Sequence, residues 1–154
     1  MSYTASKSQT GQGTTISINP NAASPPTWTV IGECLSVQFS DKNTFDDATN
    51  LQSVAKEFLA TLQDPGKLTV DVNRVGNDAG QVLVHTDYVA TPPGRSQYKV
   101  ALPINTATGQ STAGDTYVFL AFVESLSPDV KVDKKIMSKF SLQVTGAITF
   151  TAGS

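Results

Sequence analysis

The chain has few of the residues on which most enzymes and disulfide-linked proteins depend. Its 154 residues contain one cysteine, Cys34, and one histidine, His85. A single cysteine cannot form an intramolecular disulfide, and no run approaches the ~20 apolar residues of a membrane-spanning helix. Residues 1–14 are polar and lack the apolar segment of a secretory signal. We therefore expect that the protein does not associate with a membrane and that it is synthesised in a reducing cytoplasm.

Charge is also scarce, and its balance excludes one class of partner. Charged residues make up 16% of the chain, with 13 acidic against 11 basic residues, a formal net charge of −2 and a pI near 5.2. Only Arg74 and Arg95 are arginines. A strongly electrostatic nucleic-acid binder is therefore not expected, and the small net charge leaves self-association open.

The sequence is rich in uncharged polar and β-branched residues, and this composition favours sheet over helix. Alternating apolar and polar positions predict strands at 14–18, 27–32, 35–40, 67–75, 98–104, 117–126 and 140–150. Because strands and helices do not alternate regularly, we predict a mainly β fold: a sandwich or barrel of antiparallel sheets with one packed α-helix. We expect a single domain over 16–150, preceded by a flexible arm at 1–15 and followed by a short tail at 151–154.

Two segments carry helix signals. Asp78 followed by Gln81 matches a capping box, and residues 82–90 allow a helix of about three turns. Residues 41–50 are polar and acidic, so we interpret 41–66 as a long loop with room for a second short helix. That second helix is predicted by an apolar stripe at helical spacing, made of Leu51, Val54, Ala55, Phe58, Leu59 and Leu62.

No set of residues points to catalysis or to a bound cofactor. His85 falls in the predicted helix without the partners of a catalytic triad, and Cys34 lies in a strand-like run, where a lone cysteine usually behaves as a small apolar residue. The adjacent Asp46 and Asp47 lie in a polar segment and are expected to be solvated. We predict a protein that is not an enzyme and that carries no metal and no cofactor.

Two segments of opposite charge are candidates for contacts between copies. Residues 41–50 hold three aspartates and one lysine, a net charge of −2, whereas residues 129–139 hold four lysines and two aspartates, a net charge of +2. Both can be ordinary solvated turns; alternatively, the acidic loop of one subunit contacts the basic turn of the next, which produces rings or open stacks. The candidate contact residues are Asp41, Phe45, Asp46, Asp47, Leu51, Val54, Lys56, Phe58, Lys131, Lys134 and Lys135.

Several short segments follow one another in a characteristic order between about residue 11 and residue 150. They are WTVIGE at 28–33, LQSVAKEF at 51–58, LQDPG at 62–66, VN at 72–73, DAGQ at 78–81, YKVALP at 98–103 and a closing run at 132–149 that ends in VTGAIT. Their order and spacing, more than any one motif, resemble the major tail tube proteins of long-tailed bacteriophages of the lambda type. Members of that family often carry an added immunoglobulin-like domain, which we do not expect here.

The resemblance implies a structural function and a set of partners. Subunits would form hexameric rings by pairing their sheets around a channel, and the rings would stack into a tube in the virion tail, after assembly in the host cytoplasm. The loop at 41–66 would reach neighbouring subunits and the next ring. The implied partners are other copies of the chain, a tape-measure protein, and tail terminator and tail-tip proteins. DNA would pass through the lumen without specific binding, which the low pI and the two arginines suit.

The sequence is also compatible with two other interpretations of function. The first is a β-sandwich that binds a ligand or decorates a capsid, which would need a cluster of exposed aromatic side chains. Trp28, Tyr88, Tyr98 and Tyr117 fall in separate elements, so no such cluster is evident. The second is a tube protein of a contractile tail or of a secretion system, for which we expect the same fold.

Overall fold

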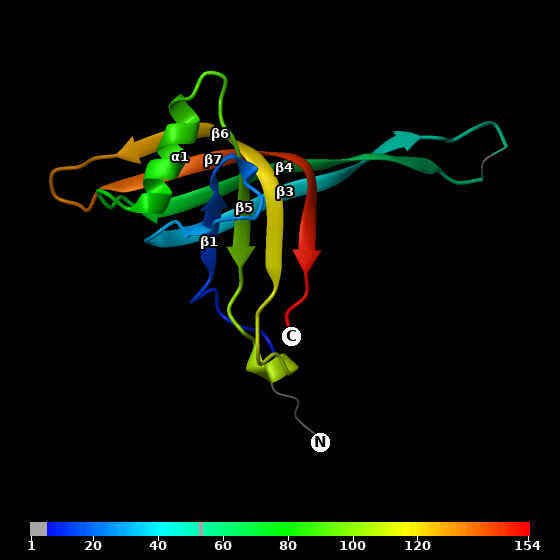
Figure 1. Cartoon of the computed structure of the whole chain (residues 1–154). Coiled ribbons are helices and arrows are strands. Elements are labelled where there is room, and N and C mark those ends of the chain that lie inside the picture. The colour runs from blue at the N-terminus through cyan, green and yellow to red at the C-terminus, as the bar shows by residue number, and fades with distance from the viewer. Residues whose placement is uncertain (1–5, 53) are drawn as a thin grey trace.

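Seven strands form one antiparallel sheet in the computed structural model, which describes residues 6–52 and 54–154 (Figure 1). The sheet order is β2-β1-β5-β6-β7-β4-β3. The strands are β1 (Thr15–Asn19), β2 (Thr29–Val30), β3 (Cys34–Asp47), β4 (Phe58–Asn73), β5 (Arg95–Ala101), β6 (Thr116–Asp129) and β7 (Met137–Thr151); the helix is α1 (Ala79–Val89), and two short 3-10 turns, Pro20–Ala22 and Thr106–Thr108, lie in connections. The prediction of a mainly β protein with one packed helix is confirmed.

The sheet divides into two halves that cross one another, because β6 and β7 are long and bent (Figure 1). β5 pairs only with the first part of β6, up to Phe122, while β4 pairs only with the first part of β7, up to Gln143. Between these regions the β6–β7 ladder has register shifts after Val118 and Val123, and Gly146 adopts a positive φ of 78°. Bulges of this kind bend strands, so β6 and β7 turn the corner between the two layers of a sandwich.

The core lies between the two layers. Alternate positions on the strands are buried, as the period of two predicts. The ring of Phe39 on β3 lies 6.0 Å from the ring of Phe119 on β6, edge to face, although these strands are not neighbours in the sheet. The sheet therefore curls over itself. The largest fully buried apolar side chains are Ile16, Ile18, Ile31, Leu68, Val70, Val72, Val84, Tyr98, Val100, Phe140 and Leu142.

Helix α1 is fixed by its first turn, where Asp78 is the N-cap as predicted, while the Gln81 side chain does not complete a capping box with the Asp78 amide. The Asp78 carboxylate accepts from the Gln81 amide at 3.0 Å and from the Gly32 amide at 3.1 Å. The buried Gln81 side chain donates to the carbonyls of Gly32 (3.1 Å) and Asn73 (2.9 Å) and accepts from the Val75 amide (3.1 Å). These bonds join the helix to the segments that follow β2 and β4, and the helix packs against β6, β1 and β2.

The second helix predicted within 41–66 is wrong, and so is the loop predicted at 41–50. β3 continues to Asp47 and β4 begins at Phe58, so the segment is a long hairpin closed by a short connection. The apolar stripe has no surface of its own chain to cover, whereas strand pairing satisfies the backbone along both strands. Gly66 lies within β4 at φ 68°, where a Cβ would lie 1.5 Å from the Ser40 carbonyl oxygen.

Both ends of the described chain contact the same part of the body. Asn105 donates through its side chain to the Lys7 carbonyl at 3.0 Å, and Gln9 donates to the Pro103 carbonyl at 3.4 Å. At the other end, the amide of Ser154 donates to the Ala113 carbonyl at 3.0 Å. The first five residues of the predicted arm at 1–15 lie outside the described residues, and its flexibility stays a prediction.

Candidate interaction surfaces

The β3–β4 hairpin projects well beyond the rest of the sheet (Figure 1). β4 pairs with β7 only from Lys67 to Asn73, so from Phe58 to Gly66 it has β3 as its one neighbour. We call residues 41–66 the arm. At about 3.3 Å per residue, the stretch from Phe58 to Lys67 overhangs the sheet by roughly 30 Å.

The arm exposes apolar side chains along its whole length. Leu51 and Val54 in its connection have relative exposures of 101% and 103%, and Phe45 and Phe58 on its strands have exposures of 62% and 61%. Leu59 and Leu62 are exposed as well. A two-stranded ribbon has no core of its own, and an exposed apolar surface of this extent marks an interaction site.

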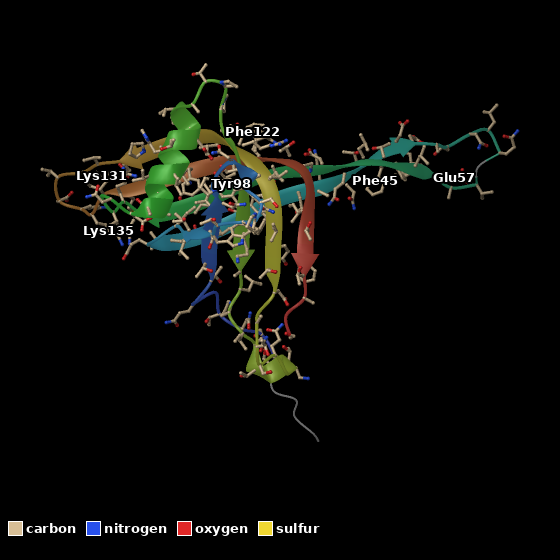
Figure 2. The ribbon with its side chains drawn as sticks, in the orientation of Figure 1. Phe45, Glu57, Tyr98, Phe122, Lys131 and Lys135 are labelled. Atoms are coloured by element: carbon tan, nitrogen blue, oxygen red, sulfur yellow. The ribbon has the colours of Figure 1, made fainter. Side chains whose placement is uncertain are left out.

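Register sorts these side chains onto the two faces of the arm. Phe45 pairs with Ala60 and Asp47 with Phe58, so all four side chains lie on one face. Leu59 pairs with Asp46 and therefore lies on the other. The arm thus has two aromatic side chains on one face and a carboxylate on each face. Figure 2 shows Phe45 on the projecting ribbon.

The connection at the end of the arm is held by polar contacts. The Thr49 amide donates to the Asp47 carboxylate at 2.9 Å, and hydrogen bonds from Thr49 lower the pKa of Asp47 below its usual value. The Glu57 amide donates to the Thr49 hydroxyl at 2.9 Å, and the Ala48 amide donates to the Glu57 carbonyl at 2.9 Å. These bonds close the hairpin without using the apolar side chains of the connection, which remain free to bind elsewhere.

The β6–β7 connection carries the predicted positive charge. We call residues 130–136 the basic loop, which holds three lysines and one aspartate. Lys131 lies 3.7 Å from Asp129, whereas Lys134 and Lys135 make no ion pair within the described part of the chain. The loop also exposes Val130 and Val132, and a hollow of about 310 Å³ lies beside it. The hollow is lined by Asp129, Lys131, Lys134, Lys135 and Met137.

The arm and the basic loop lie at opposite ends of the same strands. In the β4–β7 ladder Lys67 pairs with Gln143 and Asn73 pairs with Met137. The arm leaves this ladder at its Lys67 end, and the basic loop leaves it at its Met137 end. Figure 2 shows Lys131 and Lys135 on one side of the molecule and Phe45 and Glu57 on the other. The predicted contact residues therefore form two groups that one chain cannot bring together.

Two open strand edges flank this part of the sheet, and neither was predicted from the sequence. β3 is the last strand in the sheet order, so one side of Cys34–Asp47 has no neighbouring strand among the described residues. On the opposite side, β5 pairs with β6 only as far as Phe122, which leaves the stretch from Ser125 to Asp129 paired with β7 alone. Unpaired edges of this kind are templates for pairing with another chain. They depend on strand order, which no local pattern encodes.

The face of β3, β4 and β7 that turns away from the core is polar, and its charges are paired. Lys67 lies 2.7 Å from Glu124, and Lys139 lies 3.9 Å from Asp71, which also accepts from the Ser36 hydroxyl at 2.9 Å. Between these pairs lie hydroxyl and amide side chains, namely Gln38, Thr69, Ser141 and Gln143. The face is therefore hydrophilic and close to neutral.

The residues considered for chemistry are not gathered into a site. His85 is exposed on α1, and Cys34 is half-buried at the start of β3, where burial raises the pKa of its thiol. Among the residues that the structure describes, no group of three or more His, Cys, Asp or Glu side chains could hold a metal ion. No helix in that part of the chain is long and apolar enough to cross a membrane.

No protein-family model matches the chain, and no curated protein matches it either. Solved structures do. A chain in the tail of an empty gene transfer agent particle, refined with C6 symmetry, has 13% identity and a TM-score of 0.71, covering 94% of this chain and all of that one. A chain in the anti-feeding prophage baseplate, six-fold symmetrised, has 11% identity and a TM-score of 0.67 over 99% and 98% of the two chains. The SPP1 tail tube protein has 16% identity and a TM-score of 0.64 over 94% and 79%. The chain therefore has the fold of tail tube proteins.

Proposed function

We propose that this protein is the structural subunit of a hollow tube of the phage-tail type, in which six copies form a ring and rings stack. The observation that carries the proposal is the arm: a ribbon that overhangs the sheet by roughly 30 Å with exposed apolar side chains and nothing in its own chain to cover it. The shared fold supports the same function, since the structures that share it include a tail, a tail tube and a six-fold baseplate.

The open edges supply a way to build the ring. The free edge of β3 and the free stretch of β6 from Ser125 to Asp129 lie on opposite sides of the same layer. Pairing of one with the other in a neighbouring copy is a heterologous contact, which closes into a ring when the rotation between copies allows it. A closed ring also pairs both of these open edges.

The polar face then lines the channel. Lys67 and Lys139 are each paired with a carboxylate on that face, so few free cations point at a passing polyanion. Each contact with a phosphate group would add salt-dependent affinity for DNA. A face with few such contacts therefore suits a channel through which DNA slides. In this function the partners are a tape-measure protein during assembly and terminator and tip proteins at the two ends. The tube lies in the virion tail and is assembled in the host cytoplasm.

We place the tube in a long flexible tail of the lambda type, on the resemblance of the sequence. A tube inside a contractile machine is the second candidate, because the fold also matches a chain of a sheath-tube complex from an extracellular contractile injection system, with a TM-score of 0.52 and 11% identity. A layer of sheath subunits around the tube in native particles would favour the second candidate, and a bare tube favours the first.

Electron microscopy of the purified protein over a range of concentrations tests the proposal. We expect six-fold rings and hollow rods, with a matching rise in sedimentation coefficient. A protein that stays monomeric at every concentration, also when a tail-tip complex is added as a template, and that is missing from purified particles would contradict it.

A further inference from the structure

We propose that the arm binds the basic loop of a copy in the adjacent ring, and that this contact stacks the rings. The inference rests on the proposed function, but it assigns a contact that the fold alone does not. It separates two directions of assembly: open edges join copies sideways within a ring, and the ends of the strands join copies along the tube.

The direction follows from strand register. β3, β4, the first part of β7 and the last part of β6 run side by side, with the arm at one end and the basic loop at the other. A neighbour attached through the open edges lies beside these strands and presents its arm at the same end. A neighbour displaced along the strands instead presents its basic loop to the arm. The arm therefore meets a basic loop only across a ring boundary.

The reach of the arm fits that displacement. From Lys67 to Asn73, the part of β4 within the body of the sheet, the strand is about 20 Å long, while the arm overhangs by roughly 30 Å. An arm that extends along the strand direction therefore overlaps the body of the next copy. The edge contact does not need an overhang of this length, since Cys34 to Ser40 of β3 already lies in the body.

Charge complementarity selects the basic loop as the surface that the arm meets. The arm holds five acidic residues and two lysines, a net charge of −3, and the basic loop has a net charge of +2. Lys134 and Lys135 are unpaired in the described chain, and Asp46 and Asp47 lie at the far end of the arm. Opposite charges favour this pairing and disfavour arm against arm or loop against loop.

Apolar side chains on both partners supply most of the free energy. Leu51 and Val54 are fully exposed on the arm, and Val130 and Val132 are exposed on the basic loop, next to the hollow of about 310 Å³. Burial of such side chains is the main favourable term in association. The charges then set register and specificity, and the aliphatic residues hold the two elements together.

The test is charge reversal followed by charge exchange. In Lys134→Glu/Lys135→Glu, we expect rings to form as in the parent protein, while the concentration needed for stacking rises about tenfold or more, since like charges face each other. Rings of the Asp46→Lys/Asp47→Lys variant should also fail to stack at the parent concentration. Rings of the variant that combines all four substitutions should stack again, because opposite charges then face each other with their signs exchanged. Lys7→Glu/Arg95→Glu is the control, because it changes the net charge as much as the first variant at exposed sites outside both elements.

The outcomes separate this inference from the proposed function. Rings that do not stack in either double variant, and tubes restored in the combination, support the axial contact. Normal tubes from the Lys134→Glu/Lys135→Glu variant overturn it, as does a combined variant that stays unstacked. Loss of rings together with tubes in the double variants also overturns it, because the contact would then lie within the ring. Absence of rings in the parent protein would instead contradict the tube function itself.

Discussion

Removal of two apolar side chains from the end of the arm should weaken assembly strongly without weakening the protomer. Leu51 and Val54 are fully exposed in the free chain, so Leu51→Ser/Val54→Ser should change the free energy of unfolding by less than about 0.5 kcal/mol. In the proposed tube both side chains would be buried against a neighbour, which stabilises the contact by about 1.5 to 3 kcal/mol for each side chain. The combined loss is therefore about 3 to 6 kcal/mol per contact, and each 1.4 kcal/mol changes an equilibrium constant about tenfold.

The assay compares two quantities on the same preparations. Urea unfolding at low protein concentration reports the stability of the protomer, and sedimentation reports the concentration at which tubes form. We expect unchanged unfolding and a rise of about 100-fold or more in the concentration needed for tubes. Val75→Ser/Ile104→Ser is the matched control, since both side chains are exposed but lie outside the arm. If tubes form at the parent concentration in the arm variant, the arm does not bury its apolar end in a neighbour and the reasoning fails.

Three further changes test the fold and the polar face. Gln81→Ala removes three side-chain hydrogen bonds from a buried position and should lower the free energy of unfolding by about 3 kcal/mol, measured by urea titration; a loss below about 1 kcal/mol would refute the anchoring of α1. Burial, and secondarily the charge of Asp87, raises the pKa of Tyr98, whose hydroxyl has no partner among the described residues. Because only the unfolded chain ionises near pH 10, stability is lost as the pH rises above that value; Tyr98→Phe should become progressively more stable than the parent there, and parallel stability curves would contradict this. Asp71→Asn/Glu124→Gln frees two lysines on the polar face and should give tubes that bind DNA more tightly, with a steeper salt dependence in a filter-binding assay, whereas unchanged binding would argue that this face does not line the channel.

The sequence predicts those parts of the fold that are written in local patterns. Alternation of apolar and polar residues is enough for most strands of the body, because each strand buries one face whatever its neighbours are. The N-cap at Asp78 marks the start of α1 for the same reason, since its hydrogen bond from the Gln81 amide joins residues three positions apart.

The arm shows where local patterns fail. Residues 51–62 have an apolar stripe at helical spacing, yet Phe58 to Leu62 pair with β3 instead. A helix of that length is marginal in water unless its apolar stripe packs against another surface, and no surface in the described part of the chain covers these side chains. Strand pairing across the hairpin satisfies the backbone without burying the stripe, so the apolar residues remain available for another molecule. The sequence therefore identified the segment that exposes apolar side chains while assigning it the wrong structure.

The candidate contact residues were predictable as types of residue but not as an arrangement. Asp46, Asp47, Lys134 and Lys135 stand out by charge alone. That they lie at opposite ends of one set of strands follows from the register of β4 with β7, and the open edges follow from the strand order. Both are long-range properties, fixed only when the whole sheet is assembled.

A helical reconstruction of the assembled protein by electron cryomicroscopy is the most direct test of the account. We predict rings of six copies whose sheets continue from one copy to the next, with each arm seated on the basic loop of a copy in the adjacent ring. Particles that remain single copies at every concentration, or tubes in which the arms extend into solvent without touching a neighbour, would contradict it.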